Sequence, residues 1–287
     1  MTFDLGRATS FMAAHARILD RRRFASDSAG VLAAVDAYCN ADGGYGWGLE
    51  PDLRAPESQP GGALHALEAI ADASASPHTV ALLDWLLSIT LDDGGLPFAL
   101  PVADPTACAP FWVQADPHTS SLQITAAVAA QAHRVARRDE RARNHPWLAT
   151  ATKYCFGAIQ DMNEPPFAYV LSFALQLLDA ATDTHPEAHE LLRHLGRFVP
   201  ADGAMPVVGG AEGETLHLLD FAPEPGRPVR GLLDPDAVVA DLDRVANGQQ
   251  PDGGWAVDFS SYSPAAAMEW RGYATVRAVT TLRLNGR

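Results

Sequence analysis

The spacing best suited to acid–base chemistry occurs in the run Asp116-Pro117-His118-Thr119. A carboxylate two residues from an imidazole can raise its basicity or receive its proton, which gives a general acid or base near neutral pH. Asp and Thr also act as N-caps when they directly precede a helical run, and Asp116 or Thr119 fits that role here. Asp116 and His118 are therefore candidate catalytic residues, with helix capping as the alternative.

A second concentration of charge lies in residues 48–60, where prolines stiffen a segment that precedes another helical run. Asp52 is a candidate catalytic carboxylate in this segment, and Glu50 and Arg54 are candidate substrate-binding residues. Charged clusters of this kind also arise as structural ion-pair networks, so a salt-bridge network that fixes the loop is the alternative.

A third set of charges follows near the end of the chain. Glu269 and Arg271 interrupt an otherwise apolar helical run, where unpaired charges are costly, so each should meet a partner or a ligand. We assign Glu269 a catalytic role, and we assign Arg271 and the nearby Asp258 to substrate binding. The alternative is that Arg271 pairs with Glu50 or Asp52 across the molecule.

Aromatic residues gather near the same segments. Ring faces in a dry cavity attract cations by about 0.5 to 2 kcal/mol each, so such residues can stabilise a carbocation. Trp47, Trp112, Phe259 and Trp270 are the candidate substrate-binding rings. Two further aromatic residues directly follow Asp-Gly pairs and are expected to fill the core as turn plugs, namely Tyr45 and Trp255.

Several classes of chemistry find no support in the sequence. The net charge of −14 opposes binding to a polyphosphate backbone, so we expect no nucleic-acid partner. The three cysteines are widely spaced, no GxSxG elbow or complete dinucleotide fingerprint occurs, and His185 and His189 flank a predicted exposed helix start. We therefore expect no metal, no cofactor, no transmembrane segment and a cytoplasmic location.

The elements that position these residues follow from a recurring Asp-Gly turn. An amphipathic run ends at Asp-Gly, an aromatic or apolar residue follows, and a second helical run begins. Glycine supplies the positive φ that ends a helix, and the next hydrophobic residue can fold back on that helix. The spacing is near fifty residues between several copies, which is typical of stacked helix pairs. The copies are at Asp42-Gly43, Asp93-Gly94, Asp202-Gly203 and Asp252-Gly253.

This pattern predicts an all-α single domain over residues 1–287, because no strand-like alternation or dividing linker is present. Long loops are expected at 97–117 and 222–235. A helix near 4–20 is predicted as an additional inner helix. The expected outer helices lie near 30–40, 78–90, 146–159, 187–199 and 235–249, and the expected inner helices lie near 60–73, 119–136, 166–181, 214–221 and 265–283.

The run Gln249-Gln250-Pro251-Asp252-Gly253-Gly254-Trp255 is similar to the Gln…Gly-x-Trp repeat of squalene-type terpene cyclases. With its weaker copies it resembles the α/α-toroid superfamily, which also includes class II terpene cyclases and protein prenyltransferase β subunits. The resemblance implies an (α/α)6-type toroid whose inner helices line a central cavity. An Asp-Gly-Gly-Trp turn also resembles some α/α-toroid polysaccharide lyases.

Two catalytic signatures of the resembled enzymes are missing. The Asp-x-Asp-Asp proton donor of class II cyclases does not occur, since Asp234-Pro235-Asp236 lacks the final acid. The Asp-x-Cys zinc pair of the prenyltransferases is also absent, because no cysteine has an aspartate two residues before it.

The leading hypothesis is a cyclase-like or prenyltransferase-like enzyme. It would act on a hydrophobic isoprenoid-type small molecule, with Asp116 or Asp52 as acid or base and Arg54 or Arg271 holding an acidic or diphosphate end. Two alternatives remain open. One is a uronate lyase in which His118 takes the α proton, and the other is a non-catalytic subunit that docks a protein partner or a second copy.

Overall fold

The computed structural model describes residues 3–73 and 76–287, and most of these residues are helical, as the all-α prediction requires. No helix in this part of the chain is both long and apolar enough to cross a lipid bilayer. The helices are α1 Leu5–His15, α2 Ile18–Phe24, α3 Ser28–Val35, α4 Pro60–Asp72, α5 Thr79–Ser88, α6 Pro110–Val113, α7 Leu122–Ala136, α8 Glu140–Arg143, α9 Pro146–Gln160, α10 Ala168–Ala181, α11 Ala188–Gly196, α12 Leu218–Phe221, α13 Pro235–Asn247 and α14 Pro264–Leu284, with 3₁₀ turns at Asp36–Tyr38 and Pro228–Leu232.

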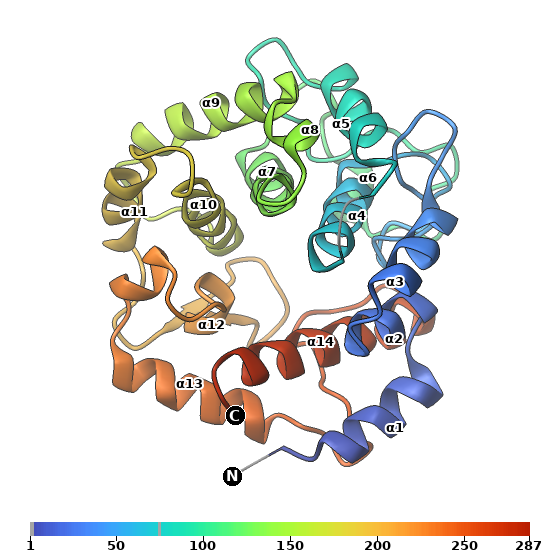
Figure 1. Cartoon of the computed structure of the whole chain (residues 1–287), viewed down its shortest axis with the longest axis vertical. Helices are drawn as coiled ribbons and strands as arrows, with labels where there is room; N and C mark the ends of the chain where they lie inside the picture. The colour runs from blue at the N-terminus through green and yellow to red at the C-terminus, as the bar shows by residue number, and fades with distance from the viewer. Residues whose placement is uncertain (1–2, 74–75) are drawn as a thin grey trace.

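The helices surround a common centre (Figure 1). Helices α4, α7, α10, α12 and α14 lie toward it, and α3, α5, α9, α11 and α13 lie outside them. Helix α7 packs against both α4 and α10, and each outer helix contacts a central one or the neighbouring outer helix. The central helices occupy the predicted inner ranges, although α12 is a single turn of four residues.

The N-terminal prediction was wrong in two respects. Residues 4–20 form two helices, because Ala16 and Arg17 adopt extended backbone conformations with ψ of 155° at both positions. The break places the Arg17 guanidinium against the Asp20 carboxylate and the Leu49 carbonyl. Helix α1 then lies on the outer side of α14 rather than among the central helices (Figure 1).

The four Asp-Gly turns share one local structure. The glycine has positive φ in each, +97° at Gly253 for example, and the aspartate side chain accepts the backbone N–H two residues later, at 2.9 to 3.2 Å. The residue after the turn is fully or nearly fully buried at Tyr45, Leu96 and Trp255. The inward-pointing plug is therefore confirmed at these three turns. The predicted helix stop at the glycine is wrong, because the helical segments before these turns end several residues earlier, at Tyr38, Ser88 and Asn247.

The two ends of the chain meet at the last of these turns. The Gln249 side chain accepts the Asp4 N–H and donates to the Asp4 carbonyl, both at 2.8 Å. A Cβ added at Gly253 would collide with the Arg7 carbonyl oxygen. The start of α1 is thereby fixed to the turn between α13 and α14, across almost the whole length of the sequence.

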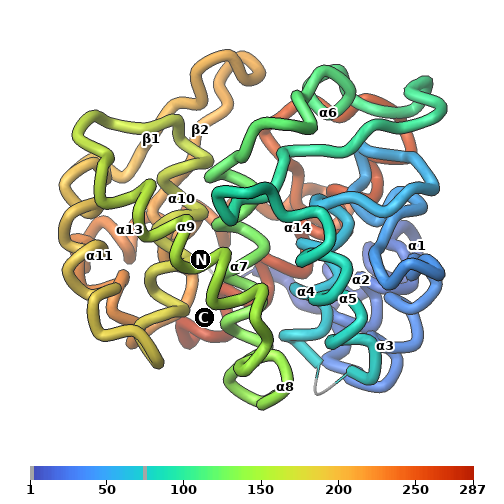
Figure 2. The backbone as a smooth tube through the Cα atoms, turned by 90° about the horizontal axis from the view of Figure 1, so that it is seen from above, coloured from blue at the N-terminus to red at the C-terminus, as the bar shows by residue number. Residues whose placement is uncertain are grey.

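Long loops gather on one face of the molecule. Helix α6 and the hairpin of β1 Ala204–Pro206 and β2 Thr215–His217 lie on the same face, and α8 lies on the opposite one (Figure 2). The hairpin is antiparallel, with Met205 opposite Leu216. It is the only sheet within the described residues, and its small size fits the absence of a strand period in the sequence.

Candidate functional site

A cavity of about 760 Å³ lies between the central helices α4, α7, α10 and α14. At one end, here called the loop end, it is lined by α6, the β1–β2 hairpin and the segment 259–262. A cavity of this volume suits a small molecule rather than a polymer chain. The resemblance had implied a central cavity in this position.

The opposite end carries a continuous chain of ion pairs, here called the ion-pair belt. The belt joins α2, α4, α7, α10 and the loop after α12 through seven contacts of 2.8 to 3.9 Å. Charges alternate along it, so each side chain meets at least one opposite charge. In order, its members are Arg23, Asp72, Arg134, Glu224, Arg137, Asp183, Arg227 and Asp179.

The wall formed by α4 holds a second polar group, here called the α4 cluster: Glu50, His65, Glu68 and Tyr273. The His65 Nε2 lies 2.7 Å from a Glu50 oxygen, and its Nδ1 lies 2.9 Å from a Glu68 oxygen. The Tyr273 hydroxyl donates to the other Glu68 oxygen at 2.8 Å. A ring with carboxylates at both nitrogens must donate at both, so His65 is an imidazolium.

The pKa values of the cluster agree with this geometry. Burial alone would lower the pKa of His65, but its hydrogen bonds with Glu50 and Glu68 raise it to about 9. Burial alone would raise the pKa of Glu68, but the His65 hydrogen bond and charge, with the nearby Arg23, lower it to about 2. At neutral pH the cluster therefore holds separated charges inside the wall.

The α4 cluster offers protons rather than metal ligands, because neither His65 nitrogen has a free lone pair. Across residues 3–73 and 76–287, no three His, Cys, Asp or Glu side chains are grouped in a way that could hold a metal ion.

Asp52 lies beside this cluster and also lines the cavity. Its backbone N–H donates to Glu50 at 3.1 Å. One carboxylate oxygen accepts the Tyr262 N–H at 2.9 Å, and the other accepts the Trp270 indole N–H at 2.7 Å. The pKa of Asp52 is raised, chiefly by burial, although these two hydrogen bonds lower it. Asp52 takes part in no ion pair of the described residues, so it is a carboxyl group poised to give or take a proton.

Aromatic rings surround the loop end. The Phe98 and Trp112 rings stack with their centroids 4.5 Å apart, and Phe259 meets Trp270 edge-to-face at 5.1 Å. Tyr262 is half exposed at this end of the cavity. Aromatic rings therefore form part of the surface that a ligand would touch here.

Five of the predicted site residues line this cavity. The structure brings together Glu50, Asp52, Trp112, Phe259 and Trp270. They come from three segments that lie far apart in the sequence, so contacts between the ends of the chain are needed to assemble them. The expected alternative for residues 48–60 also holds in part, because Glu50 belongs to the α4 cluster.

The structure corrects the expected placement of Asp116 and His118. Both are exposed and neither lines the cavity. Asp116 accepts the backbone N–H of His118 at 2.9 Å and the Thr119 hydroxyl at 2.6 Å. The carboxylate thus holds a turn before α7, which is close to the capping alternative, and the N-cap of α7 itself is Ser121.

The charges around α14 are also paired away from the cavity. Arg54 and Glu269 form an ion pair of 2.6 Å, and Arg271 lies 2.7 Å from Asp252. Arg271 therefore pairs with neither Glu50 nor Asp52, and it lies over the Phe11 ring instead. None of these four residues lines the cavity, because another face of α14, which includes Trp270, Tyr273 and Arg277, is turned toward it.

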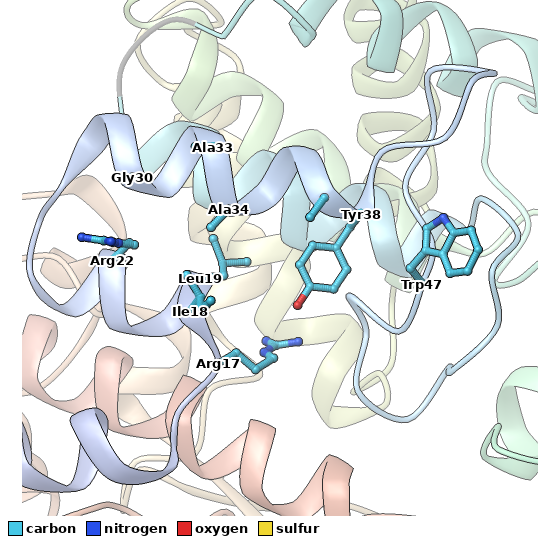
Figure 3. Close-up of a pocket in the computed structure, with 10 residues that line it drawn as sticks. Arg17, Ile18, Leu19, Arg22, Gly30, Ala33, Ala34, Tyr38 and Trp47 are labelled. Carbon is cyan, nitrogen blue, oxygen red and sulfur yellow. The ribbon is translucent and has the colours of Figure 1, made fainter.

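Asp258 and Trp47 were predicted to bind substrate, and both lie outside the cavity. Asp258 is exposed and accepts the Thr215 N–H of the hairpin at 3.3 Å. Trp47 is 59% exposed, has φ of +57°, and donates its indole N–H to Asn40. It lies at one end of a surface groove between α2 and α3 (Figure 3).

Sequence reasoning missed His65, Glu68 and Tyr273, because it searched the N-terminal ends of the inner helices and the loops before them, and not the middle of these helices. A usable signal was present. His65 and Glu68 are three residues apart on the apolar run of α4, and Trp270, Tyr273 and Arg277 follow the same spacing on α14. Residues three or four apart lie on one helical face, so these polar side chains mark the faces toward the cavity.

Comparisons with known proteins identify no relative. No protein-family model matches the chain, and a search of curated proteins found no match. The site must therefore be interpreted from its own geometry.

Proposed function

We propose that the protein is an enzyme with an (α/α)6-type toroid fold, and that it acts on a hydrophobic isoprenoid-type small molecule in the central cavity. The observation that carries the proposal is Asp52, a buried carboxyl group that forms no ion pair within residues 3–73 and 76–287 and lies in the cavity wall beside aromatic rings. The arrangement of central and outer helices in Figure 1 supports the toroid assignment. The Asp-Gly-Gly-Trp turn supports it independently.

Asp52 is the proposed acid. Its protonated carboxyl transfers the proton to one carbon of a substrate double bond, so that the O–H bond breaks, a C–H bond forms and the neighbouring carbon becomes a carbocation. Loss of a proton from an adjacent carbon back to the Asp52 carboxylate completes an isomerisation or a cyclisation without any net change in composition. The raised pKa of Asp52 makes the protonated form, which gives the proton, more accessible than in an ordinary aspartate, while the carboxylate form takes the proton back.

The α4 cluster has a positioning role in this scheme. Imidazolium His65 holds Glu50, and Glu50 accepts the Asp52 N–H. Glu50 also places a negative charge near Asp52, which contributes to its raised pKa. The rings of Trp112, Phe259 and Trp270 then provide faces that attract the developing cation.

The positions of Arg54 and Arg271 argue against a substrate with an acidic or diphosphate end. Arg54 and Arg271 are paired with Glu269 and Asp252 and do not line the cavity, so neither anchors an acidic or diphosphate group there. The proposed substrate is therefore an uncharged isoprenoid. For the same reason, and because His118 is remote from the cavity, the uronate lyase gains no support from the structure.

The test is proton transfer to carbon. The purified protein is incubated in D₂O with uncharged linear isoprenoids, namely hydrocarbons, alcohols and epoxides, and products are analysed by mass spectrometry. We expect a product that carries one deuterium on carbon. Asp52→Asn should abolish this signal, while Asp116→Asn, the matched exposed variant, should retain it. Equal incorporation by wild type and Asp52→Asn would exclude Asp52 as the acid.

A further inference from the structure

The cavity carries an excess of negative charge. Carboxylates among its described lining residues outnumber arginines eight to four, and imidazolium His65 adds one more positive charge. Charges in a low-dielectric cavity are weakly screened, so this excess repels anionic ligands and attracts cations. The substrate considered above is uncharged, so the excess calls for a separate explanation.

The uncompensated charge is concentrated at two residues. Every other carboxylate lining the cavity forms an ion pair with an arginine or with His65. Asp52 and Glu214 form none among the described residues. Glu214 accepts the Tyr169 hydroxyl at 2.6 Å and the Ala211 N–H at 2.8 Å, so both carboxylates have only neutral donors.

Both carboxylates are nearly inaccessible, at 3% exposed for Asp52 and 7% for Glu214. These two carboxylates therefore act on a ligand mainly by electrostatic attraction at a distance, and not through direct hydrogen bonds. Asp52 also accepts the Trp270 indole N–H, and a carboxylate at that position raises the electron density of the ring. The ring face becomes a stronger site for a cation.

We infer that the loop end of the cavity binds the quaternary ammonium head of an alkylammonium ligand. The head is held against the Trp112, Phe259 and Trp270 rings, in the field of Asp52 and Glu214, while the alkyl chain lies along the apolar lining. A quaternary head suits this site because it needs no hydrogen-bond acceptor and has a large polarisable surface. The inference concerns binding alone and does not depend on the proposed reaction.

The experiment compares three ligands of equal chain length: hexyltrimethylammonium, hexanol and hexanoate. Binding to the full chain is measured by isothermal titration calorimetry at fixed pH and ionic strength. We expect the ammonium ligand to bind at least about tenfold more tightly than hexanoate, with hexanol between them. Equal affinities for the ammonium and hexanoate would overturn the inference.

Variants locate the site. Asp52→Asn and Glu214→Gln each remove one negative charge and should each reduce the preference for the ammonium over hexanol by at least about threefold. Trp270→Phe keeps a ring but removes the N–H donor, and it should reduce the same preference with both carboxylates intact. Asp116→Asn serves as the control for an exposed carboxylate and should leave the preference unchanged.

Thermal unfolding shows whether each variant is folded, and a variant that does not fold is replaced by one of the others. An unchanged preference in all folded variants contradicts the site. Because no turnover is measured, a failed deuterium assay leaves this binding test intact. Conversely, a protein that incorporates deuterium but shows no ammonium preference keeps the proposed function and loses this inference.

Discussion

Two parts of the molecule combine a carboxylate with a histidine, and they behave in opposite ways. In the turn before α7, Asp116 and His118 are two residues apart and exposed. In the α4 cluster, His65 is three residues from Glu68 and fifteen from Glu50, and it is 6% exposed. Only the second arrangement places carboxylate oxygens within 3 Å of both ring nitrogens.

The difference between the two parts shows that closeness in sequence does not by itself pair a carboxylate with an imidazole. Neighbours in a turn are near each other, but Asp116 uses its oxygens to accept the His118 backbone N–H and the Thr119 hydroxyl. Burial is what makes the α4 cluster chemically distinct, because the charges there have no competing solvent and must satisfy one another. Acid–base chemistry in this fold follows the cavity face of a helix rather than the turn before it.

The largest effect that separates the two parts should come from the histidines. His65→Gln leaves Glu50 and Glu68 buried without a cation between them, and we expect it to lower the free energy of unfolding by about 3 to 5 kcal/mol. His118→Gln should change it by no more than about 0.5 kcal/mol, since the side chain is exposed. Urea unfolding followed by circular dichroism measures both. Similar losses of unfolding free energy in His65→Gln and His118→Gln would show that burial does not distinguish the α4 cluster from the exposed turn.

The next effect is pH dependence. The pKa of His65 is about 9 in the folded protein, compared with an ordinary value of 6.5. The stability that His65 contributes is therefore fully present below pH 6.5 and is lost as pH rises through 9, by at most about 3 kcal/mol. Glu68 has a folded pKa of about 2, so its contribution is present above pH 4.5 and is lost as pH falls through 2.

The comparison with His65→Gln isolates this effect. His133 has a pKa lowered to about 4, by burial and then by neighbouring cations, so it titrates in the opposite sense below pH 6.5. The difference in free energy of unfolding between wild type and His65→Gln removes that background. It should be largest between pH 4.5 and 6.5 and should shrink between pH 6.5 and 9. A difference that stays constant up to pH 9 argues against an imidazolium at this position.

A smaller effect tests how rigidly α4 holds its cluster. Gly62 lies three residues before His65, and a Cβ there would collide with the Tyr45 carbonyl. Gly62→Ala should therefore displace α4 and lower the free energy of unfolding by about 2 kcal/mol. Gly157 on α9 is exposed, with open space around its Cβ position, and Gly157→Ala should raise stability by about 0.5 to 1 kcal/mol. If both variants changed the free energy of unfolding in the same direction, the close packing of α4 against Tyr45 would be contradicted.

The parts that were predicted correctly depend on local physics. An Asp-Gly pair after an amphipathic run fixes the backbone of its own turn, so the turns and the plugs Tyr45 and Trp255 follow from a few neighbouring residues. Asp52 and Trp270 were also chosen from the sequence, and a direct hydrogen bond joins them although 218 positions separate them.

The parts that were missed depend on rotation and on long-range pairing. Which face of α14 meets the cavity decides between Trp270 and its neighbours Glu269 and Arg271, and the apolar content of the run does not specify that face. The i, i+3 spacing of Trp270 and Tyr273 would have indicated it. The break after α1 was missed because the Arg17 contact that accompanies it is with the Leu49 carbonyl, more than thirty residues away.

We expect no measurable effect from Asp116→Asn, and this makes it the sharpest test of the difference between the exposed turn and the buried α4 cluster. The amide oxygen of Asn can still accept the His118 N–H, and the Thr119 hydroxyl can rotate to accept from the amide NH₂. The Thr119 hydroxyl and then the His118 N–H lower the pKa of Asp116, but solvent screens the charge of this exposed carboxylate, so losing the charge should cost little stability. At pH 7 the melting temperature, deuterium incorporation and ammonium preference should therefore match those of wild type. Loss of incorporation in this variant, with the melting temperature retained, would move the acid from Asp52 to the turn, since an exposed residue with a purely structural role cannot remove turnover without affecting the fold.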